Sequence, residues 1–123
     1  RVFFEGMQNN ISEYYDRASV VAMTSETEGW PLALSEAQAY GCIGVAFGCT
    51  AGVSEILGPD GECGFIIPPF DEEMFAETLV KISVMSDDEQ MRIRRNAVEK
   101  RRKYAPEVIA EKWKSLFDML AGK

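Results

Sequence analysis

The chain has 123 residues, 46% of them hydrophobic, which suits one globular domain. No apolar run reaches the ~20 residues of a membrane-spanning helix, and the absence of histidine excludes a serine–histidine–aspartate triad. The formal net charge is −7, and residues 18–80 hold ten carboxylates without any lysine or arginine. This acidic middle argues against nucleic acid as the main partner, because phosphate backbones need cationic contacts.

Short apolar runs bounded by turn residues predict four strands, at residues 2–4, 19–24, 43–47 and 64–67. The continuous apolar centre of residues 19–24 suits a strand that is buried on both faces. Because helical segments alternate with these strands, we expect right-handed βαβ units and a parallel sheet.

Capping residues indicate where the first helices begin and end. Asn10 with Glu13 predicts a capping box, and the helix that follows has one apolar face. Pro31 suits the first position of a second helix, and Gly41 suits its left-handed end. The apolar face of the first helix is formed by Ile11, Tyr14, Tyr15 and Ala18.

The sequence after residue 70 predicts three further helices. Asp71 caps one that runs to about residue 84, and Ser86 with Glu89 caps the next, which runs to about residue 103. A last helix opens at Pro106. Its apolar residues follow helical spacing and predict one buried face, formed by Ile109, Trp113, Leu116, Phe117 and Leu120.

Two predicted loops, residues 25–30 and 48–54, follow strands at their carboxyl ends, where parallel sheets bind ligands. In the first loop, Gly29 permits a tight turn and a helix begins at once at Pro31. The unpaired N–H groups of such a helix start bind phosphate. The expected donors are the amides of Trp30, Leu32 and Ala33.

Two carboxylates, Glu28 and Glu36, frame this helix start. A carboxylate accepts two hydrogen bonds at once, which suits the paired hydroxyls of a ribose or a hexose. Together with the phosphate-binding amides, they predict a site for a nucleoside diphosphate sugar. The alternative is that both are ordinary stabilising charges near a helix N-terminus.

Residues 28–36, Glu-Gly-Trp-Pro-Leu-Ala-Leu-Ser-Glu, match the E-x7-E motif of glycosyltransferase family four. Other segments match that family in the same order along nearly the whole chain. They include residues 2–6, 14–19, 39–41, 45–47, 51–56 and 64–68, with Asp71. The chain therefore resembles the C-terminal, donor-binding domain of a GT-B glycosyltransferase.

The resemblance implies an α/β fold: a partial Rossmann-like, doubly wound parallel sheet, the second half of such a domain, with C-terminal helices. Residues 1–123 are then a single partial domain, expected to be inactive alone. The parent enzyme would transfer a sugar from a nucleoside diphosphate sugar to an acceptor, with retention and without a metal or other cofactor. Surface polysaccharide or glycolipid synthesis is the expected role.

The resemblance also implies roles for individual residues. Glu28 is expected to act as the catalytic residue at the transferred sugar, and Glu36 is expected to bind the ribose. The segment between them, with Gly29, Trp30, Leu32 and Ala33, would hold the diphosphate. A Gly-Gly-x-x-Glu loop lines the sugar pocket of the family, and its counterparts here are Ala51, Gly52 and Glu55, with Ala51 in place of the first glycine.

Parts of the family pattern have no counterpart in the chain. The lysine and arginine that stabilise the leaving diphosphate are not matched, since no cation lies between Arg17 and Lys81. The family's first two strands and its acceptor-binding domain are also unmatched. Residues 19–24 would then form an exposed sheet edge, which we expect to pair with residues 2–4 or to be covered in a dimer.

Two other functions are compatible with the same pattern. One is another GT-B enzyme, such as a nucleotide-sugar epimerase or a phosphorylase, and the other is a nucleotide-binding or assembly module without catalysis.

The cysteines and a basic cluster bear on the cellular location of the protein. Cys42, Cys49 and Cys63 lack C-x-x-C spacing and are expected to be small residues in a reducing compartment, which favours the cytoplasm. A basic cluster on the helix predicted from Ser86 to about residue 103 is either a solvated face or a peripheral contact with anionic lipid. It comprises Arg92, Arg94, Arg95, Lys100, Arg101, Arg102 and Lys103.

Overall fold

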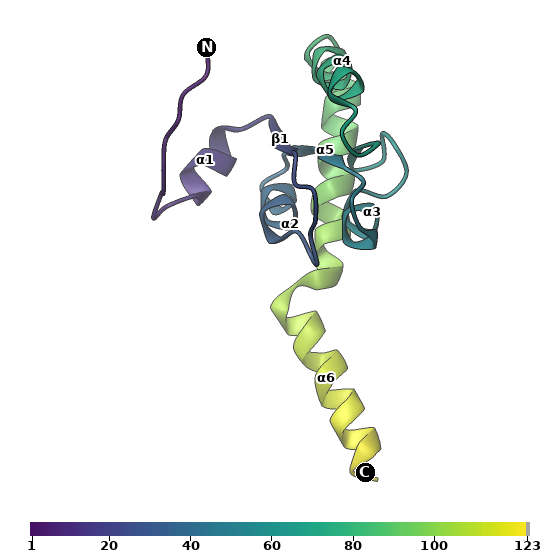
Figure 1. The fold of residues 1–123 in the computed structure, drawn as a ribbon. Coiled ribbons are helices and arrows are strands. Elements are labelled where there is room, and N and C mark those ends of the chain that lie inside the picture. The colour runs from purple at the N-terminus through teal and green to yellow at the C-terminus, as the bar shows by residue number, and fades with distance from the viewer. Residues whose placement is uncertain (123) are drawn as a thin grey trace.

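The computed structural model describes residues 1–122 and contains a three-stranded parallel sheet flanked by helices (Figure 1). The doubly wound α/β fold is therefore confirmed. In chain order the elements are α1 (Ser12–Arg17), β1 (Val20–Met23), α2 (Leu32–Ala39), β2 (Ile43–Phe47), α3 (Ala51–Leu57), β3 (Gly64–Ile67), α4 (Glu72–Ser83), α5 (Asp87–Arg101), the 3-10 helix η1 (Arg102–Tyr104) and α6 (Pro106–Leu120).

The strands lie in the order β1-β2-β3, and each neighbouring pair is parallel. The register pairs Met23 of β1 with Ala46 of β2, and Phe47 of β2 with Ile67 of β3. All three strands therefore end at one edge of the sheet. Every residue of the central strand β2 is buried. The burial on both faces that we expected for residues 19–24 is wrong, because β1 is an edge strand whose residues are half-buried or exposed.

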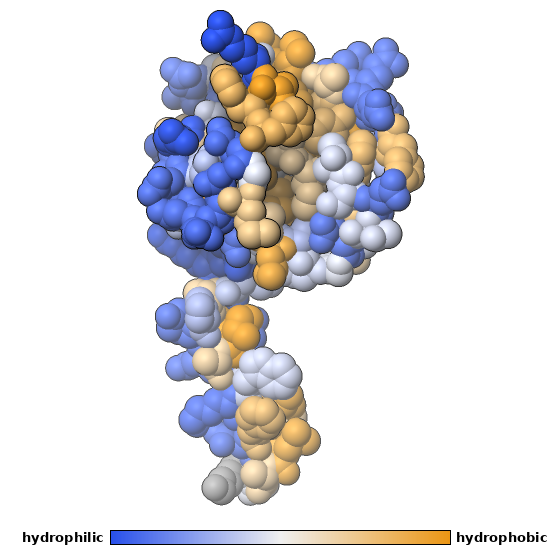
Figure 2. All heavy atoms as spheres, turned by 60° about the vertical axis from the view of Figure 1, so that its left-hand side comes forward, coloured by the Kyte–Doolittle hydropathy of each residue, from blue (hydrophilic) through white to orange (hydrophobic). Residues whose placement is uncertain are grey.

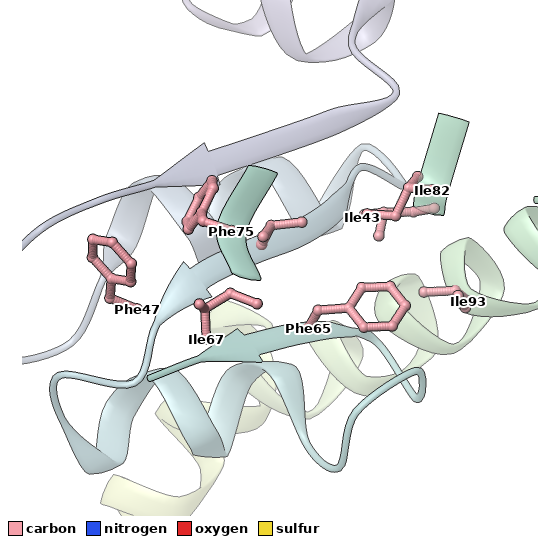
Figure 3. Close-up of a cluster of buried hydrophobic side chains, with 8 residues drawn as sticks. Ile43, Phe47, Phe65, Ile67, Phe75, Ile82 and Ile93 are labelled. Atoms are coloured by element: carbon pink, nitrogen blue, oxygen red, sulfur yellow. The ribbon is translucent and has the colours of Figure 1, made fainter. Parts of the chain in front are cut away.

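Side chains alternate across β2 and divide the core between the two faces of the sheet. Ile43, Val45 and Phe47 point to the side covered by α4 and α5, where the larger aromatic residues gather (Figure 3). Ala46 points to the opposite side, where it packs with Leu34 of α2 and with residues of α3. Each layer of helices thus seals one face of the sheet.

Glycine and glutamine hold the α2 and α3 layer close to the sheet. A Cβ atom on Gly44 would lie 2.5 Å from a Leu57 methyl group and 2.8 Å from a Leu34 methyl group, so any larger residue there would require both leucine side chains to shift. The buried Gln38 amide donates to the carbonyls of Ile56 and Cys63, at 3.3 Å each. These contacts fix α2 relative to α3 and to the start of β3.

Three of the predicted helix boundaries are confirmed by their caps. The Asp71 carboxylate accepts from the Met74 amide at 2.9 Å, and the Ser86 hydroxyl accepts from the Glu89 amide at 3.3 Å. Gly41 has φ +78° just after α2, as a left-handed helix end requires. The next-to-last helix is shorter than predicted, because its end at Arg101 tightens into η1 instead of continuing to residue 103.

The strand predicted at residues 2–4 is wrong. Val2, Phe3 and Phe4 lie outside any strand and are 72–97% exposed. A strand persists only when a neighbour satisfies its backbone groups, and within residues 1–122 only β2 pairs with β1. Direct pairing of residues 2–4 with β1 is therefore wrong as well, and a dimer that covers this edge stays a prediction.

The first helix also differs from the sequence prediction. Its N-cap is Ile11, and the Asn10 amide instead donates to the Glu13 carboxylate. No residue of α1 is buried, so its apolar face is not a core face. The helix touches the rest of the fold near Tyr15, whose ring centroid lies 5.7 Å from that of Tyr40.

The predicted burial of the last helix is wrong too. No residue of α6 is buried, and the helix projects away from the sheet (Figure 1). Its apolar residues do share one side, as the helical spacing indicated (Figure 2), and Trp113 stacks on Phe117 at 5.7 Å. Spacing therefore predicted an amphipathic helix correctly, but it carried no information on what lies against that side.

The remaining sequence expectations concern membranes and thiols. None of the helices in residues 1–122 combines the length and the apolar composition that crossing a membrane requires. Cys42 and Cys63 are buried free thiols, whereas Cys49 is half-buried and also free. Burial raises the pKa of the Cys42 and Cys63 thiols above the ordinary value.

Candidate functional site

The candidate site lies at the carboxyl edge of the sheet, where the loops after β1 and β2 meet. β1 ends at Met23 and β2 ends at Phe47, and helices α2 and α3 begin soon afterwards. A Cβ atom on Gly52 would lie 2.5 Å from the Gly29 carbonyl oxygen and 3.2 Å from Pro31. The two loops are therefore packed directly against each other, which requires glycine at position 52.

The start of α2 presents unpaired backbone amides. Pro31 occupies the N-cap and its carbonyl accepts from the Ser35 amide at 3.1 Å. The amides of Trp30, Leu32 and Ala33 make no hydrogen bond with other atoms of residues 1–122. The side chains of Leu32 and Ala33 are exposed, so an anion can reach this helix start from solvent.

The two motif carboxylates lie on different sides of this helix start. Glu28 is half-buried in the loop before α2 and has no hydrogen-bond or ion-pair partner in the described chain. Glu36 is exposed on α2 and faces Tyr15 of α1. Burial raises the pKa of Tyr15, and the negative charge of Glu36 adds to that shift. Glu28 is therefore available to a ligand, whereas Glu36 has Tyr15 beside it.

The predicted second loop is mostly helical. Ala51 is the exposed first residue of α3, and Gly52 lies behind it against the first loop. Glu55, one turn further on, accepts a hydrogen bond from the Tyr104 hydroxyl of η1. The ring of Tyr104 lies against that of Trp30, with 5.1 Å between their centroids.

Tyr104 was not predicted as a site residue, and Arg101 was predicted only as part of the basic cluster. The Arg101 guanidinium lies 5.3 Å from the Tyr104 ring centroid, so a cation does stand beside the Trp30 and Glu55 pair. Hydrogen bonding to Glu55 raises the pKa of Tyr104, and burial adds to the shift. No local pattern joins Tyr104 to Glu55, 49 positions away, so only the fold reveals this contact.

Several members of the predicted basic cluster are engaged within the protein. The Arg92 guanidinium donates to the Gly61 carbonyl at 3.2 Å, and Arg102 forms an ion pair with Glu99 at 2.7 Å. Arg101 lies on Tyr104. The cluster is therefore not one continuous free face, and the lipid-contact hypothesis depends on exposed members such as Arg95 and Lys103.

An open parallel sheet with helices on both faces and unpaired amides at its carboxyl edge defines a ligand-binding α/β domain of the doubly wound class. Residues 1–101 match the family described as glycosyl transferases group 1. The chain belongs to this family.

Two relatives are similar to the chain over most of its length. The chain is 33% identical over 108 residues to the amylovoran biosynthesis glycosyltransferase AmsD of Erwinia amylovora, covering 88% of this chain and 30% of that protein. It is 33% identical over 120 residues to an exopolysaccharide phosphotransferase of Streptomyces coelicolor, covering 96% of this chain and 12% of that protein. The chain thus spans less than a third of either relative.

Solved structures show the same fold. The sucrose-phosphate synthase of Thermosynechococcus elongatus superposes with a TM-score of 0.81 at 25% identity, over 91% of this chain and 28% of that chain. The membership and the GT-B type of fold therefore agree with the resemblance found in the sequence. The roles of single residues remain predictions.

Proposed function

We propose that this chain binds the nucleoside diphosphate sugar of a retaining glycosyltransferase, and that the protein transfers the sugar to an acceptor. The observation that carries this proposal is the start of α2, where three unpaired amides stand between Glu28 and Glu36 in the sequence. Amides and the positive helix end suit the diphosphate, and the carboxylates suit sugar hydroxyls.

Each carboxylate has its own role in this proposal. Glu28 lies in the loop before the helix start and contacts the transferred sugar, close to the bond that breaks. Glu36 lies inside α2 and binds the ribose. Gly52 allows the start of α3 to pack directly against the loop before α2. In this proposal the start of α3 contacts the sugar. One named relative is an amylovoran biosynthesis glycosyltransferase. By analogy we place the acceptor in surface polysaccharide or glycolipid synthesis, at the cytoplasmic side of a membrane.

Substitution of the two carboxylates tests these roles in the protein that carries this chain. Glu28→Gln is expected to lower kcat by about 100-fold or more with little change in nucleotide affinity, because the charge at the reacting sugar is lost. Glu36→Ala is expected to weaken nucleotide binding by about tenfold through the lost hydrogen bonds to the ribose.

The matched control is Glu26→Gln, which removes an exposed carboxylate from the same loop but outside the motif. It should leave both constants within about twofold of the unaltered values, as surface changes generally do. Sugar transfer from radiolabelled donors gives kcat, and calorimetry gives the affinity. Equal, mild effects of Glu28→Gln and Glu36→Ala contradict the assigned roles.

A second function, nucleotide binding without catalysis, is favoured by one observation. Residues 18–80, which supply the predicted donor contacts, contain no lysine or arginine to stabilise a leaving diphosphate. Binding of nucleoside diphosphate sugars without hydrolysis or transfer by the whole protein supports this function over the enzyme.

A further inference from the structure

Tyr104 connects three parts of the molecule at the candidate site. It ends η1, and its hydroxyl donates to the Glu55 carboxylate of α3. Its ring packs against Trp30, at the start of α2, with 56° between the ring planes. The Arg101 guanidinium from the end of α5 covers the same ring. One side chain therefore touches the loop before α2, helix α3 and the end of α5.

The contacts of Tyr104 restrict two side chains, Glu55 and Trp30, that would otherwise be free to move. Glu55 is exposed on a helix of seven residues, and Trp30 is 37% exposed in a loop. Each side chain would lose conformational entropy on binding a ligand, and a fixed partner removes part of that cost in advance. Tyr104 occupies one oxygen of Glu55 and leaves the other free to accept from a ligand hydroxyl.

We propose that Tyr104 is a positioning residue of the donor site, which holds Glu55 and the Trp30 loop in the geometry that binds a nucleoside diphosphate sugar. The inference rests on the proposed function, because Glu55 and the Trp30 amide are its donor contacts. Tyr104 acts through these two residues and does not itself touch the substrate. The α5–η1 junction thereby becomes part of the donor site.

The chain contains a matched control for this arrangement. Tyr14 also donates to a glutamate, Glu5, at 3.3 Å, and an arginine, Arg17, lies 5.5 Å from its ring centroid. This second group of tyrosine, glutamate and arginine lies in the N-terminal segment and α1, outside the two loops. Tyr14→Phe therefore removes the same kind of bond without touching the donor site.

The first experiment measures nucleotide affinity. The unaltered chain, Tyr104→Phe and Tyr14→Phe are titrated with UDP-glucose, GDP-glucose and ADP-glucose by calorimetry, because Glu55 is expected to contact the sugar. Tyr104→Phe keeps the ring and loses only the hydroxyl, and it is expected to weaken binding by about five- to tenfold. Tyr14→Phe should bind within about twofold of the unaltered chain. Equal affinity of Tyr104→Phe and the unaltered chain overturns the positioning role and leaves the proposed function standing.

Failure of the proposed function gives a different result. If the unaltered chain binds none of the three nucleoside diphosphate sugars, the donor site itself is wrong, and the role of Tyr104 is overturned with it. A general loss of structure is recognised by circular dichroism, which should be the same for the two variants. Tyr104→Leu, which also removes the aromatic ring, should weaken binding further than Tyr104→Phe does.

A second readout follows the contact itself. In a Trp113→Phe background, Trp30 is the only tryptophan of the chain. The pKa of Tyr104 is raised above 10.0, so the hydrogen bond to Glu55 is present below that pH and is lost as the pH rises through the raised value. Glu55 from α3 and Arg101 from α5 are the charged groups that face the phenol.

Trp30 emission should therefore change above pH 10 when Tyr104 ionises beside it. This step should persist in Tyr14→Phe and disappear in Tyr104→Phe. A step that survives in Tyr104→Phe shows that Trp30 does not sense Tyr104, and the proposed contact is then wrong.

Discussion

At the scale of single residues, Gly52 determines how the two loops of the candidate site fit together. The space for its missing Cβ is filled by the Gly29 carbonyl oxygen, Pro31 and the Trp30 backbone. These are backbone and ring atoms, which cannot turn aside as the end of a flexible side chain can. The sequence resemblance predicted a glycine in a sugar-binding loop, and the structure adds the physical reason for it.

Gly52→Ala is therefore expected to lower the free energy of unfolding by about 1–3 kcal/mol, as overpacking does. Alanine favours helices by up to about 1 kcal/mol over glycine, which offsets part of this loss. Gly29→Ala is the control, because a Cβ at position 29 meets no atom within 4 Å. Urea unfolding measures both variants, and an equal effect of the two contradicts the close contact.

At the scale of elements, the strands and helix caps were predictable because their causes are local. The apolar runs of β2 and β3 gave the observed bounds, residues 43–47 and 64–67. Asp71 and Ser86 cap helices with their own side chains, so a few neighbouring residues suffice to identify them.

The elements that were predicted wrongly depend on partners distant in sequence. Residues 2–4 have strand composition, but no strand within residues 1–122 pairs with them. The spacing of α6 describes an amphipathic helix, whereas burial depends on what lies beside it. The contact of Tyr104 with Glu55 had no local signal for the same reason.

Leucine substitutions distinguish the packed and unpacked helices. Leu34 of α2 is 0% exposed and Leu116 of α6 is 39% exposed. Leu34→Ala should lower the free energy of unfolding by about 2–5 kcal/mol, because it leaves a cavity in the core. Leu116→Ala should change it by less than about 0.5 kcal/mol. A large loss for Leu116→Ala, measured by urea unfolding, contradicts the projecting position of α6.

At the scale of the whole molecule, two different places could bind a phosphate ligand. The candidate donor site lies in a segment, residues 18–80, that has ten carboxylates and no lysine or arginine. Cations instead gather beside a cavity of about 590 Å³ near the α5–α6 junction. This cavity is lined by Glu62, Asn96, Glu99, Lys100, Arg102, Lys103 and Val108.

If attraction to positive charge alone determined binding, a nucleoside diphosphate would bind at this basic cavity. If hydrogen bonds to the free amides and to the carboxylates determined binding, it would bind at the start of α2. The fold supports the second site, because parallel sheets of this class bind ligands at the carboxyl ends of their strands. We therefore expect the diphosphate to bind at the start of α2 and not at the basic cavity.

Backbone amide NMR of the ¹⁵N-labelled chain, titrated with UDP, GDP and ADP, tests that claim most directly. The account predicts that the largest shifts occur at the amides of Trp30, Leu32 and Ala33, with smaller shifts around Gly52. Largest shifts at Lys100 and Lys103 beside the basic cavity, or none with any of the three nucleotides, contradict it.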